Sequence, residues 1–196
     1  MIKFPNKVVI GLVGPPRAGK DQVANFLKET RNFAIFAFAD QLKTEFGISK
    51  EDFEKLKTKL SCEAEHIRQE LWEFSAAVKK VDPLHFIRGV MNKIELSDSP
   101  SVISDVRTED ELNAILSCSA PVKKIYRVRG LEQDMANGYI IGTKLPEGIL
   151  LRTSLIVNNK EGLDLFYKDL ERFFLKEGLD DMLLDDKQKK GSIHES

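Results

Sequence analysis

The sequence predicts an α/β fold in three layers, in which helices flank a five-stranded, mostly parallel sheet. Two observations carry this prediction. Short apolar runs of strand length alternate along the chain with longer segments that repeat apolar residues at helical spacing. The first apolar run, residues 8–13, has no polar position at all, which is typical of a strand that is buried on both faces of a parallel sheet.

The first strand is predicted over residues 7–13 and leads through a Gly/Pro-rich turn into a helix over residues 21–30. A second apolar run, residues 33–39, predicts the second strand. Asp40 follows it and is a suitable N-cap for a helix over residues 41–46, because its side chain can accept a free backbone N–H. The first third of the chain therefore predicts two strand–helix units.

The middle of the chain predicts a helical region. Residues 48–62 are charged and favour a surface insertion, whereas residues 64–81 repeat apolar side chains at helical spacing. Asp82 and Pro83 are suited to the N-cap and first position of a further helix, which we expect to end near Leu96.

Three elements follow in short succession. Residues 101–104 predict a third strand and residues 122–128 a fourth. Between them a helix is predicted over residues 108–116. Thr108 and Glu111 have the spacing of a capping box, in which each side chain binds the backbone N–H of the other residue.

The last part of the chain begins with a glycine-rich loop over about residues 130–152, for which we expect at most a short hairpin. A fifth strand is predicted over residues 154–157 and an amphipathic helix over residues 161–176. The polar tail, about residues 178–196, is expected to fray. The whole chain, residues 1–196, is predicted to form a single domain.

Composition excludes several classes of function. The 196 residues carry 30 Lys and Arg against 31 Asp and Glu, and this balance disfavours a dedicated nucleic-acid or membrane-surface protein. Two cysteines without partners at metal-ligand spacing argue against a zinc module or a disulfide scaffold. Together with the lack of a leader or membrane-length apolar run, they favour the cytoplasm; a homodimer is compatible with the sequence.

A phosphate-binding loop is the clearest functional motif. Gly14 and Gly19 frame four residues and Lys20 follows, which is the Walker A pattern placed between a predicted strand and a predicted helix. Its backbone N–H groups can surround an anion, and Lys20 can reach the β- and γ-phosphates of a nucleotide. We expect ATP to bind the loop and the start of the next helix: Gly14, Ala18, Gly19, Lys20, Asp21 and Gln22.

Two further loop residues have expected roles. Arg17 presents a planar set of donors that can face the γ-phosphate. Asp21 stands where the Walker A pattern usually has Ser or Thr, and a carboxylate there is a suitable Mg²⁺ ligand. Because the carboxylate would repel phosphate without a metal, Asp21 predicts strict dependence on Mg²⁺. It is equally suited to stabilise the first turn of the helix.

Other motifs narrow the class of P-loop protein. A GTPase needs an Asn-Lys-x-Asp motif, whereas the chain has Asn159-Lys160-Glu161-Gly162, and it contains no Asp-x-x-Gly. A motor ATPase needs a longer chain and a Walker B acidic pair. The remaining class is a small-molecule phosphotransferase.

Within that class, the chain resembles the deoxynucleoside monophosphate kinases typical of bacteriophages. The resemblance rests on five segments in the family's order, although only the P-loop is specific by itself. They are Gly14–Asp21, Phe38–Lys43, Arg68 followed by Asp82–Ile87, Ile103–Arg107 and Ile156–Asn159. The resemblance implies a P-loop kinase fold of the adenylate kinase type. It also implies transfer of the γ-phosphate of ATP to a deoxynucleoside monophosphate with Mg²⁺.

The remaining site residues are predicted at the carboxyl ends of the strands, where open α/β sheets bind ligands. Arg107 is expected to hold the acceptor phosphate, and Asp105 to bind Mg²⁺ directly or through water. Asp40 and Lys43 follow the second strand, where nucleoside monophosphate kinases hold the acceptor. We assign Lys20, Arg17, Asp105 and Arg107 to catalysis.

Two predicted sites lie outside this group. Arg68 and Trp72 are one helical turn apart, so they can bind the acceptor phosphate and stack on its base. They belong to an acceptor-binding helical region expected over about residues 40–96. Arg129 ends the fourth strand and can reach the ATP, beside a loop at residues 130–152 that is expected to close as a lid.

Two alternatives remain open at this point. Metazoan-type phosphomevalonate kinases share the Gly-Lys-Asp loop and the Asp-x-Arg element, so another small phosphorylated acceptor is possible. The predicted lid lacks the His and acidic residue of the phage family, which is compatible with a nucleotide-binding regulatory protein that transfers no phosphate.

Overall fold

A computed structural model of the chain describes residues 8–49, 51–53, 62–130, 139–140, 143–144, 153–158 and 162–183. It contains one five-stranded sheet, ordered β2-β3-β1-β4-β7, in which all neighbouring strands are parallel. The strands are β1 (Val8–Val13), β2 (Ala34–Phe36), β3 (Ser101–Val106), β4 (Val122–Gly130) and β7 (Ser154–Asn158). The predicted α/β class and the five-stranded parallel sheet are confirmed.

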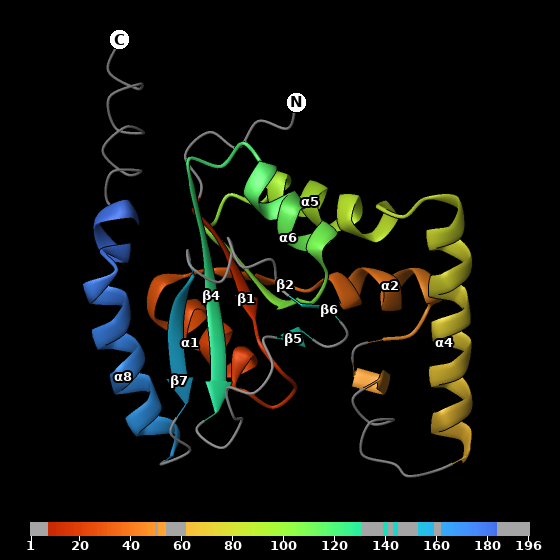
Figure 1. The fold of residues 1–196 in the computed structure, drawn as a ribbon, viewed down its shortest axis with the longest axis horizontal. Helices are drawn as coiled ribbons and strands as arrows, with labels where there is room; N and C mark the ends of the chain where they lie inside the picture. The colour runs from red at the N-terminus through yellow and green to blue at the C-terminus, as the bar shows by residue number, and fades with distance from the viewer. Residues whose placement is uncertain are drawn as a thin grey trace.

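Helices cover both faces of the sheet (Figure 1). Helices α1 (Lys20–Arg31) and α8 (Leu163–Lys176) pack on one face, against side chains such as Leu12 of β1 and Tyr126 of β4. Helices α5 (His85–Leu96) and α6 (Glu109–Ser117) pack on the other. Because β1 lies between them and all six of its residues are buried, the strand is apolar on both faces.

Two helices extend the molecule beyond the edge of the sheet. Helix α2 (Phe38–Phe46) leads away from β2 and contacts both α5 and α4 (Cys62–Val81). Figure 1 shows α4 standing at the end of the molecule opposite α8. Helix α2 therefore lies between the sheet and α4.

Several predicted boundaries shift. The second strand covers only Ala34–Phe36 of the predicted 33–39, because helix α2 already begins at Phe38. Asp40 consequently lies inside α2. The prediction that Asp40 is the N-cap of this helix is wrong, because the N-cap position is Ala37. Helix α5 begins at His85 rather than Pro83, because Asp82 accepts a hydrogen bond from the Leu84 N–H and closes a turn before the helix.

The predicted capping box of α6 is confirmed. The Glu111 N–H donates to the Thr108 hydroxyl at 3.2 Å, and the Thr108 N–H donates to the Glu111 carboxylate at 2.9 Å. The Arg107 N–H donates to the same carboxylate oxygen at 2.6 Å. One acidic side chain thus fixes the turn that joins β3 to α6.

The glycine-rich segment at residues 130–152 lies mostly outside the described residues. Within the segment, β5 (Tyr139–Ile140) and β6 (Thr143–Lys144) form an antiparallel pair, which agrees with the short hairpin expected there. The predicted tail, about residues 178–196, is described up to residue 183. Residues 179–183 are helical and Leu179 is buried in the core, so the expected fraying is wrong for this part of the tail. Among the helices that the structure describes, none is long and apolar enough to cross a membrane.

Candidate active site

The phosphate-binding loop joins the end of β1 to the start of α1. Gly14 has no room for a side chain, because a Cβ there would lie 2.1 Å from the carbonyl oxygen of Val128 on β4. Arg17 and Gly19 have positive φ angles of 61° and 100°, so the backbone curls in the way that an anion-binding loop requires. The loop therefore has the backbone form that the Walker A pattern predicted.

Lys20 is the first residue of α1, and its ammonium group turns back onto the loop. It donates to the carbonyl oxygens of Gly14 and Pro15, both at 2.8 Å. Burial lowers the pKa of Lys20, the neighbouring charges of Asp21 and Asp105 raise it, and the charge of Arg107 lowers it further. The positive charges of Lys20 and Arg107 therefore oppose one another across this part of the site.

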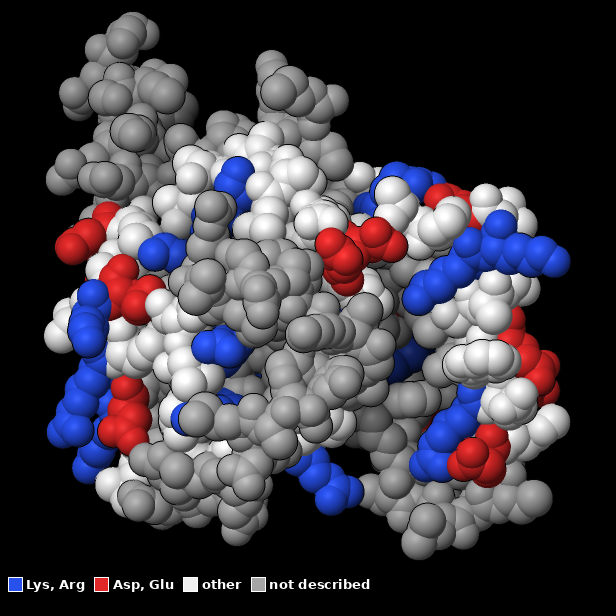
Figure 2. Space-filling model, viewed as in Figure 1, with Lys and Arg blue, Asp and Glu red and all other residues white. Residues whose placement is uncertain are grey.

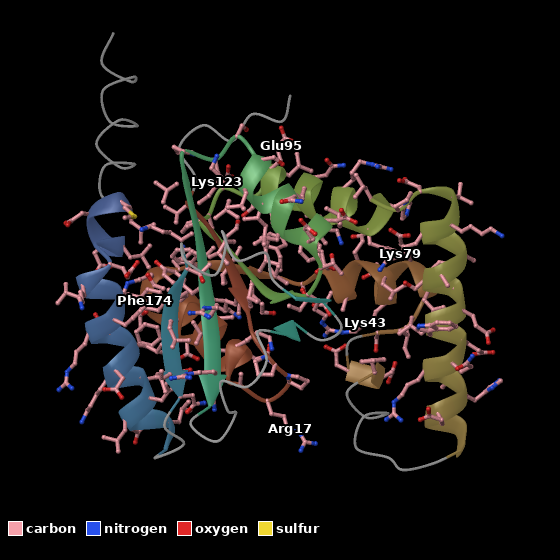
Figure 3. The ribbon with its side chains drawn as sticks, in the orientation of Figure 1. Arg17, Lys43, Lys79, Glu95, Lys123 and Phe174 are labelled. Carbon is pink, nitrogen blue, oxygen red and sulfur yellow. The ribbon has the colours of Figure 1, made fainter. Side chains whose placement is uncertain are left out.

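A cavity of about 430 Å³ opens beside the loop and the start of α1. Figure 3 shows Arg17 at this end of the molecule, near the carboxyl ends of β4 and β7. The cavity is here called the donor cavity, because it lies over the P-loop. Its walls are Arg17, Gly19, Lys20, Asp21, Gln22, Asn158, Gly162, Leu163 and Phe166.

Asn158, at the end of β7, connects this strand to the P-loop and to α1 in the wall of the donor cavity. Its side-chain amide donates to Gln22 Oε1 at 3.1 Å and reaches the Ala18 carbonyl oxygen at 3.5 Å. A Cβ on Gly19 would lie 2.6 Å from the same amide nitrogen. Sequence reasoning had placed Asn158 only in a family resemblance, and these contacts give it a place at the P-loop.

A second cavity, of about 620 Å³, lies on the other side of Asp21. It is here called the acceptor cavity. Asp40 and Lys43 lie in its wall and form an ion pair at 2.8 Å, with the Lys43 ammonium 4.7 Å from the ring centre of Phe53. Its other walls come from α1, β2 and β3: Asp21, Ala24, Asn25, Lys28, Phe33, Ala34, Ile35, Ala37, Ala39, Ser104, Asp105 and Arg107.

A third cavity, of about 360 Å³, adjoins the acceptor cavity and shares Ala39, Asp105 and Arg107 with it. It is here called the side cavity. Much of its wall is apolar, from Phe38 and Leu42 of α2 and Pro83, Phe86 and Ile87 at the start of α5. Its remaining walls are polar: Ser75 and Lys79 of α4, and Thr108, Asp110 and Glu111 of the β3–α6 connection.

The predicted pair Asp105 and Arg107 lies where the two acceptor-side cavities meet. Arg107 is exposed, and no described residue forms an ion pair with its guanidinium. Asp105 is 8% exposed and accepts the Phe38 N–H at 2.7 Å on one carboxylate oxygen and the Ala39 N–H at 2.9 Å on the other. Burial raises the pKa of Asp105, and these two hydrogen bonds oppose that rise.

Arg68 and Trp72 do not line any of the three cavities. Trp72 is 68% exposed, and Arg68 donates to Glu65 at 2.8 Å. The residues of α4 that do line a cavity are Ser75 and Lys79, seven and eleven positions after Arg68. The side cavity therefore meets α4 about one to two turns beyond Trp72, and the structure does not bring Arg68 or Trp72 to it.

Arg129 lies on β4, opposite Val157 of β7, and outside the three cavities. Arg127 shares its face of the strand. Both Nε atoms are buried and have no hydrogen-bond partner among the described residues. The predicted contact of Arg129 with ATP stays a prediction.

The charge pattern of the surface agrees with the near-neutral composition. Figure 2 shows Lys and Arg interspersed with Asp and Glu over α8 and over α4 on the face in view. Cations near the site come from the P-loop, α1, α2, α4 and the end of β3, one or two from each.

Asp21 is the carboxylate of the site that is best placed to bind Mg²⁺. Asp21 is exposed, borders both the donor and the acceptor cavity, and forms no ion pair with a described residue. Among the described residues no group of three or more His, Cys, Asp or Glu could hold a metal. A single carboxylate facing a phosphate site fits Mg²⁺, which usually takes most of its ligands from phosphates and water.

Comparison with solved structures gives a distant likeness over nearly the full chain. The protein TT1252 from Thermus thermophilus is 16% identical, with 90% of this chain and 98% of that chain covered and a TM-score of 0.50. A gluconokinase from Sinorhizobium meliloti is 15% identical, with 90% and 99% covered and a TM-score of 0.41. A sugar kinase from Janibacter sp. is 14% identical, with 87% and 94% covered and a TM-score of 0.37. The likeness to TT1252 shows a shared fold.

Comparison by sequence locates the chain more closely, although no curated protein matches it. The family model described as phosphomevalonate kinase matches residues 12–121, more than half of the chain. The matched segment runs from the end of β1 to just before β4, and it includes the P-loop, α2 and the Asp105–Arg107 strand end. The phage-type family suggested by the sequence is not the one that this comparison finds. With a P-loop, cationic residues in the walls of the acceptor-side cavities and this match, the chain belongs to the phosphomevalonate kinase family and is a small-molecule kinase.

Proposed function

We propose that this chain transfers the γ-phosphoryl group of ATP to the phosphate of a small phosphomonoester, with a deoxynucleoside monophosphate as the acceptor. The observation that carries the proposal is the shared wall of the cavities. Asp21 borders both the donor and the acceptor cavity. Arg107 lines the acceptor cavity, and its charge lowers the pKa of Lys20 in the donor cavity. Two phosphate groups can therefore meet between Lys20 and Arg107.

The chemistry needs positioning and neutralised charge more than a base. An oxygen of the acceptor phosphate, which is already anionic, forms the new bond to the γ-phosphorus. The bond from that phosphorus to the bridging oxygen breaks, and ADP leaves with the electron pair. Lys20 and Arg17 face the donor phosphates and Arg107 faces the acceptor, so that the three cations offset the repulsion between the two phosphates.

Asp21 is the residue that would hold Mg²⁺. When bound, the ion would offset charge on the β- and γ-phosphates. Asp105 is less suited to this role than the sequence indicated, because each of its oxygens already accepts a backbone N–H. We therefore place the metal contact at Asp21 alone.

The side cavity supports a nucleotide as the acceptor. Phe38, Leu42, Phe86 and Ile87 give it an apolar wall suited to a planar base. Asp110 and Glu111 give it carboxylates that can accept hydrogen bonds from amino groups but would repel a second anionic group on the ligand. A molecule with one anionic end and one neutral, flat end fits both cavities.

Phosphomevalonate is the second candidate, and the family match favours it. This molecule carries a carboxylate in addition to its phosphate. Lys79 is a second cation in the side cavity wall, in addition to Arg107, and could bind such a group. Figure 3 shows Lys79 near the upper end of α4, on the side that faces α5 and α6.

An ADP-release assay with Mg-ATP tests the proposal against a panel of deoxynucleoside monophosphates, ribonucleoside monophosphates and phosphomevalonate. Turnover with one or a few deoxynucleotides supports the first candidate, and turnover with phosphomevalonate alone replaces it by the second. Lys20→Ala should lower kcat by roughly a hundredfold or more while the circular dichroism spectrum is retained. Lys79→Ala should raise the KM of phosphomevalonate about tenfold or more, and that of a deoxynucleotide much less.

A further inference from the structure

Helix α2 begins without a cap of its own. Its N-cap position is Ala37, which has no polar side chain. The first N–H groups of any helix have no partner inside the helix, so they need one from elsewhere. Because residues of α2 line two cavities, the position of its first turn affects the shape of both.

Asp105 supplies these partners from the end of β3. Its carboxylate accepts the Phe38 N–H at 2.7 Å on Oδ1 and the Ala39 N–H at 2.9 Å on Oδ2. The side chain lies 67 and 66 positions away in sequence from these two residues, and it is buried. The contact therefore joins the first turn of α2 to the strand that ends in Arg107.

Helix α2 contributes to both acceptor-side cavities. Ala39, Asp40 and Lys43 line the acceptor cavity. Phe38 and Leu42 line the side cavity, where Asp105 is also exposed in part. Figure 3 shows Lys43 on the side of α2 that faces the space between the sheet and α4. The placement of α2 relative to Arg107 thus decides whether one acceptor molecule can contact both Lys43 and Arg107.

We propose that Asp105 is a positioning residue, whose carboxylate holds the start of α2 against the end of β3 and so sets the spacing between Lys43 and Arg107. In this role it binds the backbone and acts on the acceptor through α2, rather than as a ligand of Mg²⁺. The effect on acceptor binding rests on the proposed function, whereas the contact with α2 does not.

Hydrogen exchange of the wild-type chain tests the contact without any substitution. The amides of Phe38 and Ala39 should exchange slowly, because Asp105 accepts both. The first amides of α8, at Leu163 and Asp164, serve as the internal control, since Gly162 offers no side-chain cap and no described group accepts them. Exchange of Phe38 and Ala39 as fast as in this control would overturn the proposal.

Asp105→Asn and its control Asp169→Asn test the consequence for the enzyme. Asparagine keeps one acceptor oxygen and turns an amide N–H₂ toward the other donor. Asp169 is exposed on α8 and lies outside the three cavities. We expect Asp105→Asn to raise the acceptor KM about tenfold, with little change in kcat, in ATP KM or in the Mg²⁺ concentration for half-maximal rate. Asp169→Asn should leave the acceptor KM within about threefold of wild type.

A rise in the Mg²⁺ requirement of Asp105→Asn with an unchanged acceptor KM would overturn the proposal and make Asp105 a metal ligand. If the wild-type chain turns over no acceptor in the panel, the proposed function fails instead. The exchange rates of Phe38 and Ala39 then still decide whether Asp105 holds α2.

Discussion

The backbone of Arg107 is fixed by a hydrogen bond, whereas its side chain is exposed. Its N–H donates to Glu111 at 2.6 Å, while its guanidinium extends into the wall shared by the acceptor and side cavities. Among the described residues none forms an ion pair with this guanidinium, which suits a residue that must bind an incoming anion without first breaking an ion pair.

Arg107→Lys should therefore weaken acceptor binding while the fold is retained. Lysine keeps the charge but loses the planar pair of donors that can bind two oxygens at once, so we expect the acceptor KM to rise about 10- to 100-fold. Steady-state kinetics with varied acceptor measure this effect. Arg172→Lys is the control, because Arg172 is 81% exposed on α8, and an equal effect there would contradict the role of Arg107.

At this scale, the sequence predicts residues whose role depends on their immediate neighbours. The P-loop is such a case, since Gly14, Gly19 and Lys20 act through one turn of backbone. The contacts of Asp105 with Phe38 and of Asn158 with Gln22 join residues 67 and 136 positions apart. No local pattern contains them, and this is why Asp105 was assigned to the metal.

At the scale of elements, glycines mark two close approaches of different kinds. Gly14 faces the backbone carbonyl of Val128, with 2.1 Å left for a Cβ. Gly89, on α5, faces the side chain of Gln41 on α2, with 2.7 Å to its Cδ. A carbonyl in a sheet cannot move aside, whereas a glutamine on a helix can change its rotamer.

Gly14→Ala and Gly89→Ala should consequently differ in stability. We expect Gly14→Ala to lower the free energy of unfolding by about 3 kcal/mol or more, because it forces two strands apart. Gly89→Ala should change it by less than about 1 kcal/mol, since the helix gains from alanine what the α2–α5 contact loses. Urea unfolding measures both, and equal losses would show that Gln41 is as rigid as the sheet.

Helix α8 is attached to α1 through a second long-range contact. Arg31 donates to Glu171 at 3.0 Å and to Asp180 at 2.7 Å, and its guanidinium carbon lies 5.4 Å from the Phe26 ring centre. The side chain is 5% exposed, whereas its acidic partners are 55% and 42% exposed.

Arg31→Ala should lower the free energy of unfolding by about 2 kcal/mol. Loss of a buried guanidinium costs more than a surface pair, and water around the two carboxylates reduces the cost below that of a fully buried pair. Thermal and urea unfolding check this value. Arg172→Ala, which breaks only a 3.7 Å pair on the surface, should cost less than about 0.5 kcal/mol.

Prediction of elements from the sequence failed mainly at their ends. The apolar pattern located every strand of the sheet, because β1 is apolar over its length and the other strands are rich in β-branched and other apolar residues. It placed the start of α2 too late, since Asp40 has the residue type of a cap while the actual cap, Asp105, lies on β3. The position of the side cavity along α4 could not be predicted either, because the cavity is formed with residues of α2, the start of α5 and the β3–α6 connection, which are distant in sequence.

At the scale of the whole molecule, two buried carboxylates make stability depend on pH. Burial raises the pKa of Glu111 from 4.5 and that of Asp105 from 3.8, and backbone hydrogen bonds oppose both shifts. The folded chain therefore binds protons that the unfolded chain has released. Stability from these groups is complete below the unfolded values and is lost as pH rises through the folded ones.

Glu111→Gln isolates this contribution, because glutamine does not titrate. We expect the difference in unfolding free energy between wild type and Glu111→Gln to shrink as pH rises from about 4 to 7. Urea unfolding at a series of pH values measures it. Comparison with the variant is needed because Glu45 acts in the opposite sense: hydrogen bonds from Gln41 and His85 outweigh burial and lower its pKa. A difference that grows with pH would mean that the capping box stabilises the charged form.

The central place of β1 has a consequence for how the chain is made. Its two neighbours in the sheet are β3, which begins at Ser101, and β4, which ends at Gly130. During synthesis, β1 therefore cannot pair with either neighbouring strand until more than half of the chain has been made. Such non-local pairing slows folding and leaves apolar strand edges open in the nascent chain. A ribosome-bound chain that ends before β3 should thus bind chaperones and no ATP. A chain that includes β7 and α8, whose residues complete the donor cavity, should bind ATP and no longer bind chaperones.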